Sequence, residues 1–171
     1  MKIELKSIKH MDGHEGIAFS AKLYIDGKRV GNVRDDGNGG EVYIWIDPAF
    51  KKLEKEAREW ALGLPPIKWV TKEKTYSFDS DLEMVVNNLF DEYLKKKEAS
   101  AMLRLSKKYI IWGNDNYYKK VSWKGKTLEE MSRLPKGVNV LQSNVDRIKA
   151  TLKDNEKIFF PEYLETLGVK I

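Results

Sequence analysis

Residues 17–34, which read IAFSAKLYIDGKRVGNVR, decide the fold of the first half of this chain. Apolar and polar side chains alternate from Ile17 to Ile25, which is the period of a strand with one buried face. Asp26 and Gly27 then supply the two positive φ angles of a type I′ turn, whose twist suits paired strands. We therefore predict a β-hairpin in which residues 28–34 return antiparallel to the first strand.

Further strands and a helix are predicted on either side of this hairpin. Residues 1–8 alternate in the same way, whereas residues 42–46 are apolar throughout, which indicates a strand covered on both faces or one whose outer face meets another surface. Asp47 and Pro48 form a helix start, with Asp as N-cap and Pro as the first helical residue. The apolar stripe of that helix consists of Phe50, Leu53, Ala57, Trp60 and Ala61. Residues 1–66 thus have the predicted order β-β-β-β-α, with the helix covering the sheet.

The second half, residues 67–171, is predicted to begin with a long helix. Ser80 and Glu83 fit a capping box, and the apolar stripe continues to Leu105, with a break near Lys97. Thr127 and Glu130 fit a second capping box at the start of a short helix. The other predicted elements are strands at 109–112, 117–123 and 138–141 and helices at 144–152 and 161–167. The fold class is therefore α+β, with an N-terminal antiparallel sheet backed by a helix, a helical middle and a second small α+β portion, all in one compact unit.

Composition narrows the chemistry that this chain of 171 residues can perform. It has no cysteine and two histidines, which excludes disulfides, thiolate zinc sites and a cysteine nucleophile. No run approaches the roughly 18 apolar residues of a membrane span, and the N-terminus is charged and alternating. We expect a cytoplasmic protein that does not enter a membrane.

Positive charge is concentrated in one part of the sequence. The net charge is +5, yet residues 95–126 contain ten lysines and arginines against two acidic residues. That segment is about +8 and the rest of the chain about −3. A local basic segment is the electrostatic signature of a polyanion-binding surface.

A glycine-rich loop, residues 34–41, follows the hairpin and reads RDDGNGGE. A phosphate-binding loop normally precedes a helix and carries a cation, whereas this loop precedes a strand and contains three carboxylates. Its oxygen-bearing residues are also mis-spaced for a calcium loop. Two interpretations remain: a hairpin connection with bulges, or a partner-binding loop. The residues of such a partner-binding loop are Arg34, Asp35, Asp36, Asn38 and Glu41.

The order of these motifs resembles that of a known group of proteins. An alternating strand, the turn Tyr24-Ile25-Asp26-Gly27-Lys28, a Gly-x-Val return strand and the Asp-Gly-x-Gly-Gly loop follow one another within residues 1–46. This pattern is similar to a family of small uncharacterised proteins encoded by phages and bacterial mobile elements. The resemblance implies a phage or prophage accessory protein, such as a host-takeover or anti-defence factor, and assigns no catalytic residue.

Residues 107–126 form a predicted basic hairpin with interleaved aromatic side chains. Lysines neutralise phosphates, and exposed aromatic rings stack on bases, so this hairpin is a candidate nucleic-acid interface. The alternative is a surface hairpin whose aromatic residues pack inward while its lysines keep the edge soluble. Alternation places Tyr109 and Ile111 on one face and Ile110 and Trp112 on the other, so that one set is core. The candidate binding residues are Lys107, Lys108, Trp112, Tyr117, Tyr118, Lys119, Lys120, Trp123 and Lys124.

Catalytic and metal-binding motifs are missing from the sequence. It contains no nucleophile elbow, phosphate-loop lysine motif, dinucleotide-binding glycine pattern or paired-histidine metalloprotease helix. His10 and His14 flank Asp12-Gly13, which predicts a solvated turn rather than a helix face that would hold zinc. We therefore predict no catalytic residue, cofactor or metal ligand, and the enzyme question stays open.

Three functional hypotheses follow from these features. The first is a non-catalytic protein of phage or mobile-element type that binds a host protein. The second is a nucleic-acid-binding module that uses the basic hairpin, with the open face of the first sheet able to share the task although the charge outside residues 95–126 is unfavourable. The third is a metal-dependent hydrolase that uses Asp35, Asp36 or Glu41.

Overall fold

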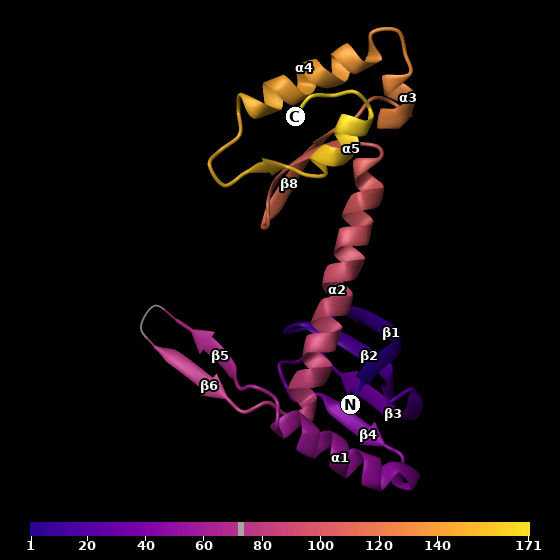
Figure 1. Cartoon of the computed structure of the whole chain (residues 1–171), viewed down its shortest axis with the longest axis vertical. Coiled ribbons are helices and arrows are strands. Elements are labelled where there is room, and N and C mark those ends of the chain that lie inside the picture. The colour runs from indigo at the N-terminus through magenta and orange to yellow at the C-terminus, as the bar shows by residue number, and fades with distance from the viewer. Residues whose placement is uncertain (72–73) are drawn as a thin grey trace. The chain divides into compact units, whose positions relative to one another are not determined.

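The computed structural model of the protein describes residues 1–71 and 74–171, and it confirms the α+β class (Figure 1). The chain forms two compact units, Met1–Lys95 and Lys96–Ile171, each with its own sheet and helices. The division differs from the boundary after residue 66 that the sequence suggested, because the start of a later helix completes the core of the first sheet. No helix of the described residues has the length and apolar character needed to cross a bilayer.

The first unit is built on a four-stranded antiparallel sheet in the order β1-β2-β3-β4. Asp26 (φ 47°) and Gly27 (φ 80°) both adopt positive φ, which confirms the turn between the second and third strands. The bounds of the strands are β1 Ile3–Asp12, β2 Ile17–Ile25, β3 Lys28–Asp35 and β4 Tyr43–Ile46. The predicted β-hairpin and its flanking strands are therefore present.

Two helices cover one face of this sheet. The side chain of Asp47 accepts a hydrogen bond from the Ala49 backbone N–H at 2.9 Å and so caps the short 3-10 helix η1 (Pro48–Phe50) that leads into α1 (Lys51–Leu62). Ala57 and Ala61 of α1 are buried against the sheet, as the helical spacing predicts. The first turns of α2 (Leu82–Ser106) add further buried side chains to the same core, namely Leu82, Val86 and Phe90.

The start of α2 differs from the predicted capping box. The Ser80 hydroxyl donates instead to the Pro65 carbonyl at 2.7 Å, and Asp81 Oδ1 accepts from the Met84 backbone N–H at 2.7 Å. Glu83 accepts from the Val42 backbone N–H at 2.9 Å, which ties the helix to the residue that follows the glycine-rich loop. The prediction was wrong because Asp caps helices as well as Ser does, and Asp81 lies one residue closer to the first turn.

The predicted long helix is present as α2, which is continuous over 25 residues. It has no break near Lys97, because the lysines there are good helix formers and no Gly or Pro interrupts them. One feature before it was not predicted. Strands β5 (Ile67–Val70) and β6 (Thr75–Phe78) form a separate two-stranded hairpin before α2.

The second unit packs three helices with a three-stranded sheet in the order β8-β7-β9. The bounds are β7 Ile110–Asn114, β8 Tyr117–Val121, α3 Leu128–Ser132, α4 Gly137–Lys149, β9 Lys157–Ile158 and α5 Pro161–Thr166. Both reciprocal hydrogen bonds of the Thr127–Glu130 capping box are present. The core gathers buried side chains from every element but β8, among them Ile110, Leu128, Leu141, Val145, Ile158 and Leu164.

The strand predicted at 138–141 is wrong, since these residues belong to α4. Leu141, Val145 and Ile148 are all buried, and their spacing of four and three residues continues one helical stripe. Gly137 lets the helix begin against α3, because a Cβ there would lie 1.8 Å from the Met131 carbonyl oxygen. The two-residue strand β9 is too short to give a sequence pattern.

Candidate nucleic-acid interface

The basic hairpin predicted from the sequence is the pair β7 and β8. Ile110 pairs with Val121, and Trp112 pairs with Lys119. β7 is the central strand of its sheet, since Trp112 also pairs with Ile158 of β9. One strand of the candidate interface is thus the central strand of the sheet, which fixes the position of the hairpin.

The inward face of the hairpin contains Ile110, Trp112 and Val121, which pack in the core of the second unit. Trp112, a predicted binding residue, is half-buried there, which limits its surface for stacking. Ile111 on the opposite face is also buried, with 1% of its surface exposed. Each face of β7 therefore carries a buried isoleucine, whereas the sequence required only that one set of side chains be core.

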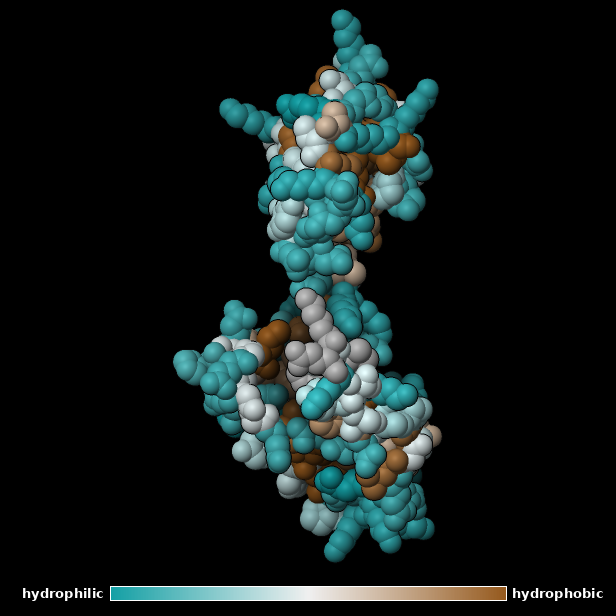
Figure 2. Space-filling view, turned by 90° about the vertical axis from the view of Figure 1, so that its left-hand side faces the viewer, coloured by the Kyte–Doolittle hydropathy of each residue, from teal (hydrophilic) through white to brown (hydrophobic). Residues whose placement is uncertain are grey.

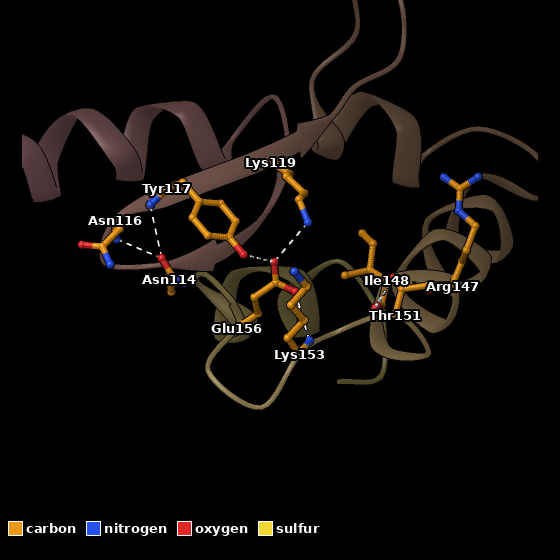
Figure 3. A network of polar contacts seen from close by, with 9 residues as sticks. All are labelled: Asn114, Asn116, Tyr117, Lys119, Arg147, Ile148, Thr151, Lys153 and Glu156. Carbon is orange, nitrogen blue, oxygen red and sulfur yellow. Dashed lines mark hydrogen bonds and ion pairs between the residues drawn. The ribbon is translucent and has the colours of Figure 1, made fainter.

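Two of the predicted binding residues are engaged by a buried acid, Glu156 (Figure 3). The Tyr117 hydroxyl donates to Glu156 Oε1 at 2.7 Å, and Lys119 Nζ donates to the same oxygen at 3.1 Å. The Lys153 backbone N–H donates to Oε2 at 3.0 Å. The Glu156 side chain is only 1% exposed, so these three donors replace its water. Glu156 ties β8 to the loop before β9, and sequence reasoning missed it because its partners are 37 and 39 residues away.

The network shifts the ionisation of its members. Donation by the Tyr117 hydroxyl, by the Lys153 backbone N–H and by Lys119 lowers the pKa of the Glu156 carboxyl from 4.5 to about 2. The same hydrogen bond to Glu156 raises the pKa of Tyr117 above its ordinary value. Glu156 is therefore a carboxylate at neutral pH, and Tyr117 remains a hydrogen-bond donor.

A hollow of about 210 Å³ lies beside the hairpin and combines lysines with aromatic rings. Lys108 and Lys126 line it together with Tyr109 and Trp123. The turn at Gly125 (φ 68°) creates this arrangement, since the Lys126 backbone N–H donates to the Trp123 carbonyl at 3.0 Å and brings Lys126 back beside Trp123. Tyr109 and Lys126 lie within the predicted hairpin but were not among its predicted binding residues. The Trp-Lys-Gly-Lys turn at 123–126 is a sequence signal that could have found Lys126.

The remaining predicted residues of this interface lie on the hairpin and its flanks. Lys120 Nζ lies 4.6 Å from the centre of the Tyr109 ring, a cation–π arrangement. Tyr118 is 46% exposed, and Lys107 and Lys124 are exposed. Among residues 1–71 and 74–171, the lysines 107, 108, 120, 124 and 126 form no ion pair with a carboxylate.

The charge is divided unequally between the two units. Residues 96–171 contain 16 lysines and arginines against nine acidic residues, a net charge of +7, whereas residues 1–95 have a net charge of −2. Most of the visible surface of the second unit is hydrophilic in the space-filling view (Figure 2). The hairpin therefore lies in the part of the chain that attracts polyanions.

Close packing explains why the glycine-rich loop has a glycine at position 37. Gly37 adopts φ 68°, and a Cβ there would lie 2.7 Å from the Ala18 nitrogen and 3.0 Å from the Gly13 Cα. The Gly37 carbonyl accepts from the Glu15 backbone N–H at 2.8 Å, and Asp35 Oδ1 accepts from the Gly37 N–H at 2.7 Å. The loop is thus packed on the β1–β2 connection, and a side chain at position 37 would separate them.

The polar residues proposed for a partner-binding loop divide into two groups. Arg34 and Asp36 form an ion pair at 2.6 Å with each other, and Asp35 caps the turn. Asn38 and Glu41 are exposed. In the described residues no group of three or more His, Asp or Glu side chains is arranged to hold a metal ion, so Asp35, Asp36 and Glu41 form no such site there.

The two histidines do not share one turn. His14 is exposed in the β1–β2 connection, as predicted. His10 instead lies within β1, half-buried, with its ring 6.1 Å from that of Phe90 and 5.9 Å from that of Tyr93. The prediction of a solvated turn fails for His10 because β1 extends to Asp12, and the ring contributes to packing against α2.

Comparison with known proteins adds no assignment: no family model, curated protein or solved structure matches this chain.

Proposed function

We propose that the protein binds nucleic acid through the second unit, at the β7–β8 hairpin and the hollow beside it. The observation that supports this proposal is the joint lining of that hollow by Lys108 and Lys126 with Tyr109 and Trp123. A phosphate is matched by the two ammonium groups, and a base by the exposed parts of the half-buried Tyr109 and Trp123 rings. The net charge of +7 on residues 96–171 would accelerate association with a polyanion.

Single-stranded nucleic acid is the form that this site fits best. Its bases are free to stack on aromatic rings, and stacking supplies roughly 1 to 3 kcal/mol per base without sequence preference. Within the hairpin, the exposed ring of Tyr118 and the Lys120 ammonium extend the same chemistry along β8. A duplex would engage only the lysines.

The test is a salt titration of binding to a labelled oligonucleotide by fluorescence anisotropy, between about 50 and 200 mM salt. Removing two phosphate contacts with Lys108→Gln and Lys126→Gln should make the slope of log K against log salt less steep by about 1.4 for a single strand. Lys149→Gln, on an exposed position of α4, serves as the matched control and should leave the slope unchanged.

Charge reversal at Lys119 is a poor test of this site. A glutamate there would face Glu156, whose carboxylate is buried, and would disrupt the fold. A loss of binding would then report unfolding. Equal slopes for the wild type, the Lys108/Lys126 variant and the control would contradict the proposal.

A second candidate function is binding of a host protein through the glycine-rich loop, as the resemblance to phage proteins implies. The loop is held by the Asp35 and Glu15 hydrogen bonds, and it leaves Asn38 and Glu41 exposed on a preorganised backbone. Asn38→Arg with Glu41→Arg should abolish a complex isolated with the wild-type chain, while Lys51→Glu on α1 should retain it. Retention by both variants would exclude the loop as the contact.

A further inference from the structure

The open face of the β1–β4 sheet carries an ordered set of basic and aromatic side chains. Strand pairing aligns residues into rows across the sheet, and paired residues point to the same side. One row runs Lys9, Ser20, Arg34, Tyr43, and the next runs Lys6, Lys22, Asn32, Trp45. Each row leads from a lysine on β1 to an aromatic ring on β4, across about 14 Å for four strands.

This face is the one that the helices leave uncovered. α1 and the first turns of α2 pack on the opposite side, against buried residues such as Leu23, Val33 and Ile46 (Figure 1). On the open side, Tyr43 is 67% exposed and Trp45 is 57% exposed. Because both rings are exposed, the strand at 42–46 is not covered on both faces, and the first of the two sequence expectations for it is wrong.

The charge of the open face opposes that of the unit to which it belongs. Residues 1–95 have a net charge of −2, yet the face and its rim hold five cations against two acids. The cations are Lys6, Lys9, Lys22, Arg29 and Arg34, and the acids are Glu4 and Asp36. Six of the 17 acidic residues of the unit lie on α1 and α2, which pack on the opposite side of the sheet. The negative net charge of the first unit, which is unfavourable for nucleic-acid binding, is therefore not found on this surface.

The two rings on β4 are spaced for successive bases. Tyr43 and Trp45 are two residues apart on one strand, which separates them by about 6.8 Å, or twice the 3.4 Å rise per nucleotide of a stacked strand. A single strand that runs along β4 with its bases unstacked from each other can place one base on each ring. Its phosphates then lie toward Lys22 of β2, in the same row as Trp45.

We propose that the open face of the β1–β4 sheet binds single-stranded nucleic acid, with Tyr43 and Trp45 stacking on bases and Lys22 contacting phosphates. This surface goes beyond the hairpin interface and does not depend on it, because none of its residues belongs to the second unit. DNA and RNA share the required chemistry, and parallel measurements with oligothymidine and oligouridine distinguish them.

The experiment uses the full chain and labelled oligonucleotides about 20 nucleotides long, which exceeds the span of one such sheet. Trp45→Ala should weaken binding roughly 5- to 150-fold, the factor that corresponds to loss of one stacked base. Lys22→Gln should make the salt slope less steep by about 0.7. Leu62→Ala, an exposed apolar residue on α1, and Lys51→Gln are the matched controls, and both should bind like the wild type.

Repeating the series in the Lys108→Gln, Lys126→Gln background separates this proposal from the hairpin proposal. Loss of affinity on Trp45→Ala in that background supports the sheet surface whether or not the hairpin binds. Photochemical cross-linking of a thiouridine-containing strand to wild-type protein, read by peptide mass spectrometry, should identify residues 43–45 without any substitution. Wild-type affinity for Trp45→Ala together with no cross-link in 43–45 would overturn the proposal and leave the face to a protein partner.

Discussion

Alanine substitution of individual glycines tests whether the glycine-rich loop is required by packing. Gly37→Ala introduces a side chain at a positive φ and within 2.7 Å of the Ala18 nitrogen. Gly27→Ala, in the type I′ turn, introduces the same backbone strain with no atom within 4 Å. Gly40→Ala, in the same loop as Gly37, meets neither obstacle.

The expected magnitudes follow from these two costs. A left-handed backbone costs a residue with a side chain about 1–2 kcal/mol, and overpacking costs about 1–3 kcal/mol more. Gly37→Ala should therefore lower the free energy of unfolding by about 2–5 kcal/mol and Gly27→Ala by about 1–2 kcal/mol. Gly40→Ala should change it by less than about 0.5 kcal/mol.

Asparagine variants separate the two costs, since Asn tolerates positive φ. Gly27→Asn should be close to the wild type, whereas Gly37→Asn should stay destabilised because its Cβ still meets Ala18. Native-state hydrogen exchange of the β2 amides is the appropriate assay, because it reports the first unit alone in a chain of two units. Equal protection in Gly37→Ala and Gly40→Ala would refute the argument that packing requires Gly37.

Two further predictions concern the second unit. The pKa of Glu156 is about 2 in the fold against 4.5 ordinarily. The stability that its carboxylate contributes is therefore complete above about pH 4.5 and is lost as the pH falls toward 2. Glu156→Gln should make this loss of stability with falling pH less steep, as measured by acid denaturation followed by circular dichroism. Thr127→Ala removes the capping box of α3 and should lower the free energy of unfolding in urea by about 1 kcal/mol, and an unchanged urea midpoint would contradict the role of that cap.

Local signals predicted those parts of the fold that depend on neighbouring residues. The Asp26-Gly27 turn, the Asp47-Pro48 helix start and the Thr127 capping box each need only a few adjacent residues, and all three are present. The strand expected at 138–141 failed because a run of four residues with two valines does not distinguish a strand from the start of a helix. The cap of α2 failed because Ser80 and Asp81 are both good caps, and tertiary contact with Pro65 decides between them.

The sequence located the basic hairpin but did not reveal the side-chain contacts within it or the basic open face of the first sheet. Composition located the basic hairpin, but the contact of Glu156 with Tyr117 and Lys119 spans more than thirty positions and leaves no sequence pattern. The basic open face of the first sheet was obscured by the net charge of the surrounding sequence. Strand register, which aligns Lys6 and Lys22 with Trp45, is needed before that face becomes visible.

The buried carboxylate of Glu156 has opposite effects on the stability of the second unit and on its affinity for polyanions. It holds Lys119, so one cation of the hairpin is withdrawn from any phosphate that approaches β8. A neutral residue at 156 would release that cation and strengthen polyanion binding, while removing the tie between β8 and the loop before β9. Selection for tighter binding and selection for a more stable second unit therefore act in opposite directions on this residue.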